Sequence, residues 1–440
     1  MFNRPIFYGW WIAITALFVN AILSAPSYGA TGLWVNSLES QFGWSRTQLS
    51  IAFSLGQLEA SIAGPVVGYL IDRFGGKKVC ILGTYIVILG FIILSQTVPV
   101  TNSRESWADP AIFYLAYTTI MLGGSMAGWI PMTVILNNWF DKRRSLAMGL
   151  GSVGFSIGTF ALVPLLALMI NSDAWGWSNT SLVIALTMPL TIFMVAKVIK
   201  NSPEEVGLLP DGTVETSSQF QSRSLDKPSP KKSLDFSISE ALREKVFWLI
   251  AFGHGSSAMM TAAMMVHLIL AFMNQGLSIQ VSATMWGFTM AIAGVSQLLG
   301  GLIGDRFHKP ISICIFGCLQ SIGVAFAVRV STVPTAIVFG LIYGIGFGTR
   351  APITTAMRGD YFGRKAFGKI MGISTLPMMA MSLVTPIIAA SLYDHSGNYF
   401  TAFPLIGAMG FCGSFLFLFC KKPLHPSEKS TLRKKHDPRQ

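Results

Sequence analysis

The sequence predicts an all-α membrane protein in which twelve transmembrane helices form two pseudo-symmetric six-helix bundles. Three observations support this fold class. The chain is 52% hydrophobic and only 12% charged, roughly half the charged fraction of an average soluble protein. Twelve windows are long and apolar enough to cross a bilayer, and the last six repeat motifs of the first six. This composition excludes a soluble enzyme, a disordered regulator and a nucleic-acid-binding protein.

Each predicted transmembrane segment provides about 20 apolar residues, which a helix rising 1.5 Å per residue needs to cross a hydrocarbon core of roughly 30 Å. The windows lie at 7–35, 47–71, 78–97, 111–137, 144–170, 177–199, 244–273, 281–304, 310–330, 334–357, 367–392 and 398–420. The five cysteines lie within or at the ends of these windows without metal-ligand spacing. We therefore expect them to pack against other helices, and we expect no metal or cofactor.

The net charge of +12 reflects membrane topology. With the N-terminus placed in the cytoplasm, 28 of the 32 Lys and Arg residues fall on the cytoplasmic side or in adjoining helix ends. Two lie in opposite loops (Arg46 and Arg104), and two lie within spans (Arg329 and Arg350). Because cytoplasmic loops collect Lys and Arg, we expect a multi-pass protein with both termini in the cytoplasm. The expected location is the plasma membrane, or the inner membrane of a bacterium, with the lipid bilayer and no nucleic acid as partner.

A polar stretch at 200–243, rich in Ser and Pro, separates the two groups of windows. Such a composition is typical of a linker. The predicted organisation is therefore an N-terminal half at 1–199, the cytoplasmic linker at 200–243, a C-terminal half at 244–420 and a basic cytoplasmic tail at 421–440.

The two halves share an internal repeat. The heptapeptide Gly68-Tyr-Leu-Ile-Asp72-Arg73-Phe74 returns after the eighth window as Gly301-Leu-Ile-Gly304-Asp305-Arg306-Phe307. The fourth window aligns in the same way with the tenth, and Arg350 then falls opposite Gly128, beside Trp129. Many secondary transporters are built from such repeats and bind substrate near the midplane between them.

These motifs resemble known signatures. Gly68-xxx-Asp72-Arg73-Phe74-Gly-Gly-Lys-Lys is similar to the cytoplasmic loop motif of the major facilitator superfamily. Three segments resemble the monocarboxylate porter and oxalate/formate antiporter branch of this superfamily. They are 8–11 (Tyr-Gly-Trp-Trp), 139–149 and 203–212. The windows at 281–304 and 370–392 lack the cations with which the antiporters hold a dicarboxylate, so we do not expect oxalate exchange.

The resemblance covers essentially the whole chain. It implies that the two halves alternate in exposing a central site to either side of the membrane. It also implies that the repeated loop motif acts as a cytoplasmic gate, in which carboxylates and guanidinium groups bind the neighbouring half in one state and release it in the other. The gate residues are Gly68, Asp72, Arg73, Asp305 and Arg306.

Two charged residues lie deep within the predicted spans, where a charge costs about 2.5–3.5 kcal/mol on translocon scales. Arg350 is predicted to anchor a substrate carboxylate through two hydrogen bonds. The alternative for Arg350 is a staple between helices. Glu59 is predicted to be a proton site, and its alternative is a permanent ion pair or a hydrogen bond within the wall. A third interpretation gives the carboxylate of a zwitterion to Arg350 and its ammonium group to Glu59.

Four further residues complete the predicted substrate site. They are Trp129, Tyr28, Asn20 and His267. His267 resembles a histidine that recurs in related porters, and it is also a candidate for proton coupling. The alternative for the polar members of this set is a hydrogen bond that joins two helices.

The predicted function is proton symport of a small organic anion, a monocarboxylate, by alternating access of a monomer. An organic-anion exchanger and a carrier of a zwitterion are the alternatives within transport. A transporter-like sensor is a further alternative, although neither linker nor tail has the apolar content of an output domain. The sequence contains no nucleotide-binding loop, metal cluster or nucleophile–base arrangement, so we do not expect an enzyme.

Overall fold

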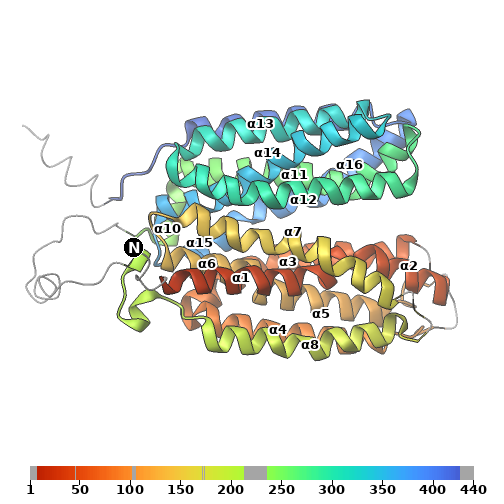
Figure 1. Cartoon of the computed structure of the whole chain (residues 1–440), viewed down its shortest axis with the longest axis horizontal. Helices are drawn as coiled ribbons and strands as arrows, with labels where there is room; N and C mark the ends of the chain where they lie inside the picture. The colour runs from red at the N-terminus through yellow and green to blue at the C-terminus, as the bar shows by residue number, and fades with distance from the viewer. Residues whose placement is uncertain are drawn as a thin grey trace, which may run out of the picture.

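The two halves of the chain form two helical bundles that lie side by side (Figure 1). The structure is a computed structural model and describes residues 7–44, 46–101, 106–170, 172, 174–212 and 235–426. Most of the predicted linker (213–234) and most of the predicted tail (427–440) therefore lie outside the described residues. The all-α fold predicted from the sequence is confirmed.

Among the described residues, the N-terminal bundle contains eight α-helices and one π-helical turn. They are α1 (Tyr8–Ser24), η1 (Ala25–Gly29), α2 (Thr31–Phe42), α3 (Arg46–Phe74), α4 (Gly76–Ser95), α5 (Ala111–Ala127), α6 (Trp129–Trp139), α7 (Arg144–Ile170) and α8 (Gly176–Val198). Two 3-10 turns, η2 (Pro203–Val206) and η3 (Pro210–Gly212), and the short helix α10 (Ile238–Arg243) flank the undescribed part of the linker.

The described part of the C-terminal bundle, residues 245–426, contains seven α-helices. They are α11 (Lys245–Asn274), α12 (Ile279–Arg306), α13 (Lys309–Phe326), α14 (Val333–Phe362), α15 (Phe367–Ser374), α16 (Leu376–Ser396) and α17 (Ala402–Phe415). The short 3-10 turns η4 (Ala327–Arg329) and η5 (Leu416–Phe419) follow α13 and α17.

Each of the twelve predicted windows coincides with one helix or with consecutive helices. Within the described residues, eleven of these segments are long and apolar enough to cross a membrane. The remaining window, 47–71, falls on α3. Its 29 residues extend about 43 Å at 1.5 Å per residue, but polar side chains such as Gln48 and Glu59 lower its hydropathy.

Proline explains the break between α5 and α6. Pro131 has no backbone N–H, so the carbonyl of Ala127, four residues earlier, cannot receive a helical hydrogen bond. The chain turns at Gly128, and the thiol of Cys80 donates to the Ala127 carbonyl oxygen at 2.9 Å. The break is therefore held by a side chain of α4, and Cys80 packs between helices as the sequence predicted.

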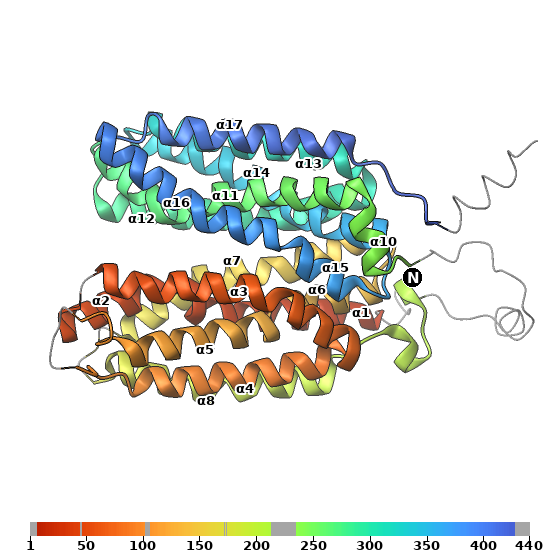
Figure 2. The same cartoon turned by 180° about the vertical axis from the view of Figure 1, so that it is seen from behind.

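The bundles meet along two crossings, α3 with α15 and α7 with α12, and Figure 2 shows the first of them. Both crossings depend on glycine. A Cβ atom added at Gly68 would collide with the carbonyl oxygen of Gly368, and one added at Gly149 would come within 2.5 Å of the carbonyl oxygen of Gln297. The backbones thus approach closely at both crossings, which only small residues allow.

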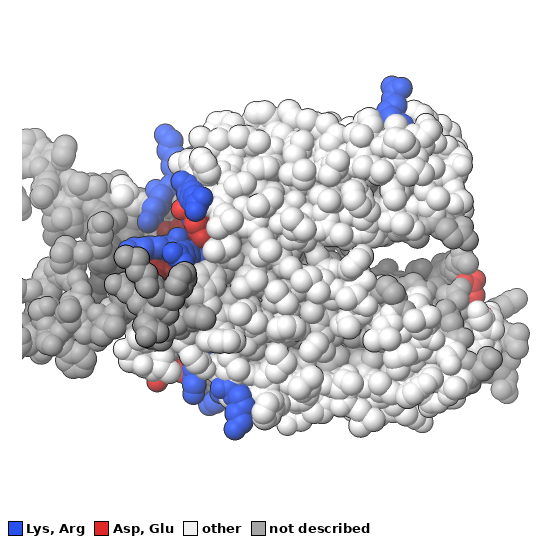
Figure 3. Space-filling model, viewed as in Figure 1, with Lys and Arg blue, Asp and Glu red and all other residues white. Residues whose placement is uncertain are grey.

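Charged side chains gather at one end of the molecule (Figure 3). The N-terminus, the linker segments and α10 lie at this end (Figure 1), which we call the basic end. At the opposite end, the far end, Figure 3 shows a cleft between the bundles. The bundles are therefore closed on each other at the basic end and separated at the far end.

Candidate functional site

Two carboxylates close the basic end in equivalent ways. Asp72, at the end of α3, accepts hydrogen bonds from the backbone N–H groups of Gly368 (3.0 Å) and Lys369 (3.1 Å), in the first turn of α15. Asp305, at the end of α12, accepts from Ser145 (2.8 Å) and Leu146 (3.0 Å), in the first turn of α7. Each carboxylate thus occupies the N-terminus of a helix in the other half, where unpaired N–H groups attract negative charge. We call each such arrangement a latch.

The arginines that follow these aspartates form no hydrogen bond or ion pair to a described residue of the other half. Arg73 is exposed, bonds the hydroxyl of Tyr69 at 2.9 Å and lies over the ring of Phe74. Arg306 is exposed as well. Of the predicted gate residues, the structure therefore places Asp72, Asp305 and Gly68 at contacts between the halves in this state.

A third connection between the halves involves Arg144 of α7. Its guanidinium donates to the carboxylate of Asp360 on α14, which also pairs with Lys309 at 2.6 Å. Nearby, the Asn137 side chain of α6 donates to the Gly363 carbonyl oxygen at 3.3 Å. The C-terminal end of α14 is therefore held against both α6 and α7.

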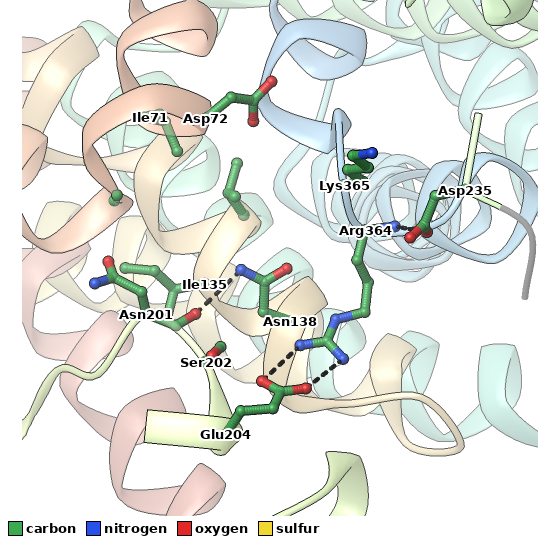
Figure 4. A pocket seen from close by; sticks show the side chains of 13 residues that line it. Ile71, Asp72, Ile135, Asn138, Asn201, Ser202, Glu204, Asp235, Arg364 and Lys365 are labelled. Carbon is green, nitrogen blue, oxygen red and sulfur yellow. Dashed lines mark hydrogen bonds and ion pairs between the residues drawn. The ribbon is translucent and has the colours of Figure 1, made fainter. Parts of the chain in front are cut away.

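The linker ends frame a cavity of about 530 Å³ at the join between the halves (Figure 4). Glu204 of η2 binds the guanidinium of Arg364 with two hydrogen bonds of 3.2 and 3.3 Å, and Asp235 accepts from the Arg364 backbone N–H at 2.7 Å. Partial burial disfavours ionisation of Glu204, but hydrogen bonds from Ser202, the backbone and Arg364 outweigh it and hold the pKa of Glu204 below its ordinary value. The cavity is a feature of the closed basic end.

The latches lead to a first prediction, for Asp72→Asn. The change removes the negative charge from the N-terminus of α15, an interaction worth about 0.3–2 kcal/mol, so we expect the closed state to lose roughly two- to thirtyfold in population. Transport should fall, while substrate affinity stays close to that of the wild type. The matched control is Arg73→Gln, because the contacts that Arg73 makes among the described residues, to Tyr69 and Phe74, stay within its own half. Lost binding with unchanged transport would contradict the latch assignment.

Arg350 lies inside the C-terminal bundle. Its side chain is 1% exposed. It donates to the carbonyl oxygen of Gly253 on α11 and to the Ser414 hydroxyl on α17 (3.4 Å), and its guanidinium lies over the ring of Phe417. Three elements of one half are joined in this way. This placement favours the staple, which the sequence left open as the alternative to an anion anchor.

Glu59 is half-buried on α3, and both of its carboxylate oxygens are buried without a hydrogen-bond partner in the described part of the chain. Tyr28, in the π-helical turn η1, is close enough to interact electrostatically with it. The structure therefore brings two predicted site residues together. It records no ion pair between Glu59 and either Arg350 or another described cation.

Asn20 and Trp129 occupy positions in the wall of the N-terminal bundle. The Asn20 amide donates to the Gly151 carbonyl oxygen at 3.0 Å and so joins α1 to α7. Trp129 is half-buried at the start of α6 and packs against a cluster that includes Val67 of α3 and Met371 of α15. Both placements favour a structural role.

His267 is held by both of its ring nitrogens. Nε2 lies 2.9 Å from the carbonyl oxygen of Pro386, and Nδ1 lies 3.1 Å from the hydroxyl of Tyr399. Because a carbonyl oxygen only accepts, Nε2 must carry the hydrogen, and Nδ1 of the neutral ring then accepts from Tyr399. His267 therefore ties α11 to α16 and to the segment before α17.

A second buried arginine was missed from the sequence. Arg358, on α14, is 1% exposed and donates to Nδ1 of His254 on α11 at 2.9 Å and to the carbonyl oxygen of Thr354 at 3.4 Å. Its Nε is buried without a partner in the described part of the chain. The predicted window ended at 357, so Arg358 was counted with the helix ends at the interface. The only signal in the sequence is its spacing of eight residues from Arg350, about two helical turns.

Comparisons with known proteins agree with the fold. A family model described as Major Facilitator Superfamily matches residues 16–319 and 250–440. Monocarboxylate transporter 13 of Rattus norvegicus is 22% identical over 413 residues, which cover 92% of this chain and 87% of that protein. Monocarboxylate transporter 10 of Homo sapiens is 25% identical over 430 residues, which cover 94% of this chain and 78% of that protein. The MFS-type transporter pynF of Aspergillus niger is 24% identical over 422 residues, covering 91% and 82%.

Solved structures show the same architecture. The proton:xylose symporter XylE superimposes with a TM-score of 0.73 at 14% identity, covering 94% of this chain and 96% of that one. The human organic anion transporter MFSD10 superimposes with a TM-score of 0.67 at 15% identity, covering 94% and 100%. At these identities the likeness concerns the fold alone.

Proposed function

Because this chain belongs to the major facilitator superfamily and is therefore a multi-pass secondary transporter, we propose that it carries a small organic anion, a monocarboxylate, together with protons. We further propose that the basic end faces the cytoplasm, as the concentration of Lys and Arg there favours. The structure then corresponds to the state that is closed to the cytoplasm and open to the outside.

The observation that carries the proposal is the presence of two guanidinium groups, Arg350 and Arg358, at 1% exposure in the C-terminal half. Neither forms an ion pair with a carboxylate among the described residues. A buried charge is costly unless a counter-charge compensates it. A substrate carboxylate supplies that counter-charge, and the names of several relatives, monocarboxylate transporters, support this substrate class.

Arg358 is the better candidate for the anion anchor. It shares a face of α14 with Ala351 and Phe347, seven and eleven residues before it, and both are partly exposed. Arg350 instead points at Gly253 and Ser414 within its own bundle. Arg358 also lies one residue before Gly359, whose added Cβ would collide with Asn137 of the N-terminal half. Arg358 thus lies at the level of a contact that closes the basic end, and opening of that contact would give its anion a path to that side.

Glu59 is the proposed proton acceptor of the N-terminal half. Its buried carboxylate has no hydrogen-bond partner in the described residues, so protonation removes an uncompensated charge. The same placement favours one second candidate, a zwitterionic substrate. In that case Glu59 with Tyr28 would hold an ammonium group and Arg358 a carboxylate.

The test is uptake of labelled monocarboxylates, dicarboxylates and amino acids into proteoliposomes, with and without an inward proton gradient. We expect the gradient to drive monocarboxylate uptake. Arg358→Gln should reduce uptake about ten- to hundredfold, because hydrogen bonds to a charged group contribute about 1.5–3 kcal/mol each. Glu59→Gln should keep exchange and lose the response to the gradient. Uptake of amino acids alone would favour the zwitterion, and full uptake by Arg358→Gln would overturn the anchor.

A further inference from the structure

We propose that His254 controls Arg358, so that a proton on His254 frees the guanidinium for a substrate carboxylate. This inference deepens the proposed function and rests on it for the identity of the anion. It concerns a contact between α11 and α14 that lies apart from Glu59 and from the latches.

The direction of the hydrogen bond fixes the protonation state of His254. A guanidinium has five N–H donors and no acceptor. The Arg358 nitrogen 2.9 Å from Nδ1 of His254 therefore donates, and Nδ1 must be unprotonated. A proton bound at Nδ1 removes the acceptor and places two positive charges at hydrogen-bond distance. The contact and the protonated ring thus exclude each other.

Arg358 has little else to hold it in place. Its remaining hydrogen bond runs to the Thr354 carbonyl oxygen of its own helix at 3.4 Å, and its Nε has no partner within the described chain. Arg350 is different, because it bonds two other helices and an aromatic ring. Loss of the His254 contact therefore leaves Arg358 a buried cation that a carboxylate would stabilise.

The surroundings of His254 contain no competing acid among the described residues. The charged groups that act on it are Arg358 and Arg350, both on α14. From α16, Met378 and Met381 pack against the adjacent Gly255, and from η5 Phe417 packs against Gly253. Cys314 and Cys318 of α13 lie beside Arg350. His254 as a residue is partly exposed, which leaves a path for a proton.

The consequence is ordered binding of proton and anion. At high pH neutral His254 holds Arg358, and anion affinity is low. As pH falls, the proton goes to Nδ1, Arg358 turns toward the face of Ala351 and Phe347, and the carboxylate binds there. For one proton taken up with each anion, linkage predicts an affinity change of about tenfold per pH unit above the titration of His254.

The test measures the reactivity of Arg358 toward phenylglyoxal, an arginine-selective reagent, on the full-length protein without substrate. Labelling is quantified by mass spectrometry as the ratio of Arg358 to exposed Arg73, which cancels the intrinsic pH dependence of the reagent. Because the positive charges of Arg358 and Arg350 disfavour a proton on His254, the ring takes it up below the range of an ordinary histidine. Between about pH 7 and about pH 5, we expect this ratio to rise at least about tenfold.

Two variants decide the mechanism. Asn at 254 offers an acceptor that never titrates, so His254→Asn should keep the ratio low at both pH values. Phe offers no hydrogen-bond acceptor, so His254→Phe should give a high ratio at both pH values. The matched control is His395→Asn, because His395 is an exposed histidine at the end of α16, and it should behave like the wild type.

A ratio in His254→Asn that still rises as pH falls would overturn the inference. Because this labelling needs no substrate, its outcome is separate from the proposed function. A failed switch with intact monocarboxylate uptake leaves that function standing, and a working switch without any monocarboxylate uptake overturns the function alone.

Discussion

Replacement of Gly68 by alanine is expected to hold the transporter open at the basic end and to block its cycle. The added Cβ would collide with the carbonyl oxygen and carbon of Gly368, and backbone atoms cannot rotate out of the way as a side chain can. Overpacking typically costs about 1–3 kcal/mol, and here it acts only on the closed state, so we expect that state to lose about five- to 150-fold in population.

Cysteine accessibility checks this expectation. Met371 of α15 is fully buried at the α3 crossing, so in a cysteine-depleted background Met371→Cys should react with an impermeant thiol reagent only when the basic end opens. Gly68→Ala should raise its labelling from that side. The control is Gly287→Ala, because no atom lies within 4 Å of a Cβ added at Gly287. Equal labelling in wild type and Gly68→Ala would show that the crossing does not govern closure.

Replacement of Arg350 by glutamine is expected to destabilise the C-terminal half without removing the anion site. The guanidinium links α11, α14 and α17, so its loss removes the hydrogen bonds that join α14 to Gly253 and to Ser414. Hydrogen bonds to a charged group contribute about 1.5–3 kcal/mol each, and we therefore expect a clear fall in the melting temperature of the purified protein.

Arg358→Gln provides the matched comparison, because Arg358 is equally buried on the same helix but bonds one neighbouring helix through a single histidine. Its melting temperature should change less, while its uptake should be lost. For Arg350→Gln, uptake per folded molecule should remain. An unchanged melting temperature with lost uptake in Arg350→Gln would restore Arg350 as the anion anchor.

The two arginines show what a sequence of this kind predicts and what it leaves open. Hydropathy and the position of Arg350 in its window predicted its depth in the membrane. Depth does not specify the side of the helix from which a residue projects, and α14 is buried on most sides by α12, α13 and α7. Only the packed neighbours, Gly253 and Ser414, show that Arg350 points into its own bundle.

The gate was predicted more completely, because its residues belong to a repeated motif next to helix ends. The repeat indicated Asp72 and Asp305 as equivalent, and the structure gives them equivalent hydrogen bonds. Their partners are backbone N–H groups, which no pattern of residue types reveals. Arg358 was missed in the prediction from the sequence for a different reason. It lies at the margin of an apolar window, and its burial against His254 of α11 depends on how the folded helices pack.

The reciprocal arrangement of the two latches makes closure of the basic end cooperative. Each half contributes one carboxylate and one helix start, so a single rotation aligns both pairs. Once one latch forms, the other is an intramolecular reaction at high effective concentration, and it closes with little further loss of entropy. The two latches therefore act as one bivalent contact between the halves. States with one latch engaged should be short-lived, and the molecule should exchange between fully closed and fully open forms.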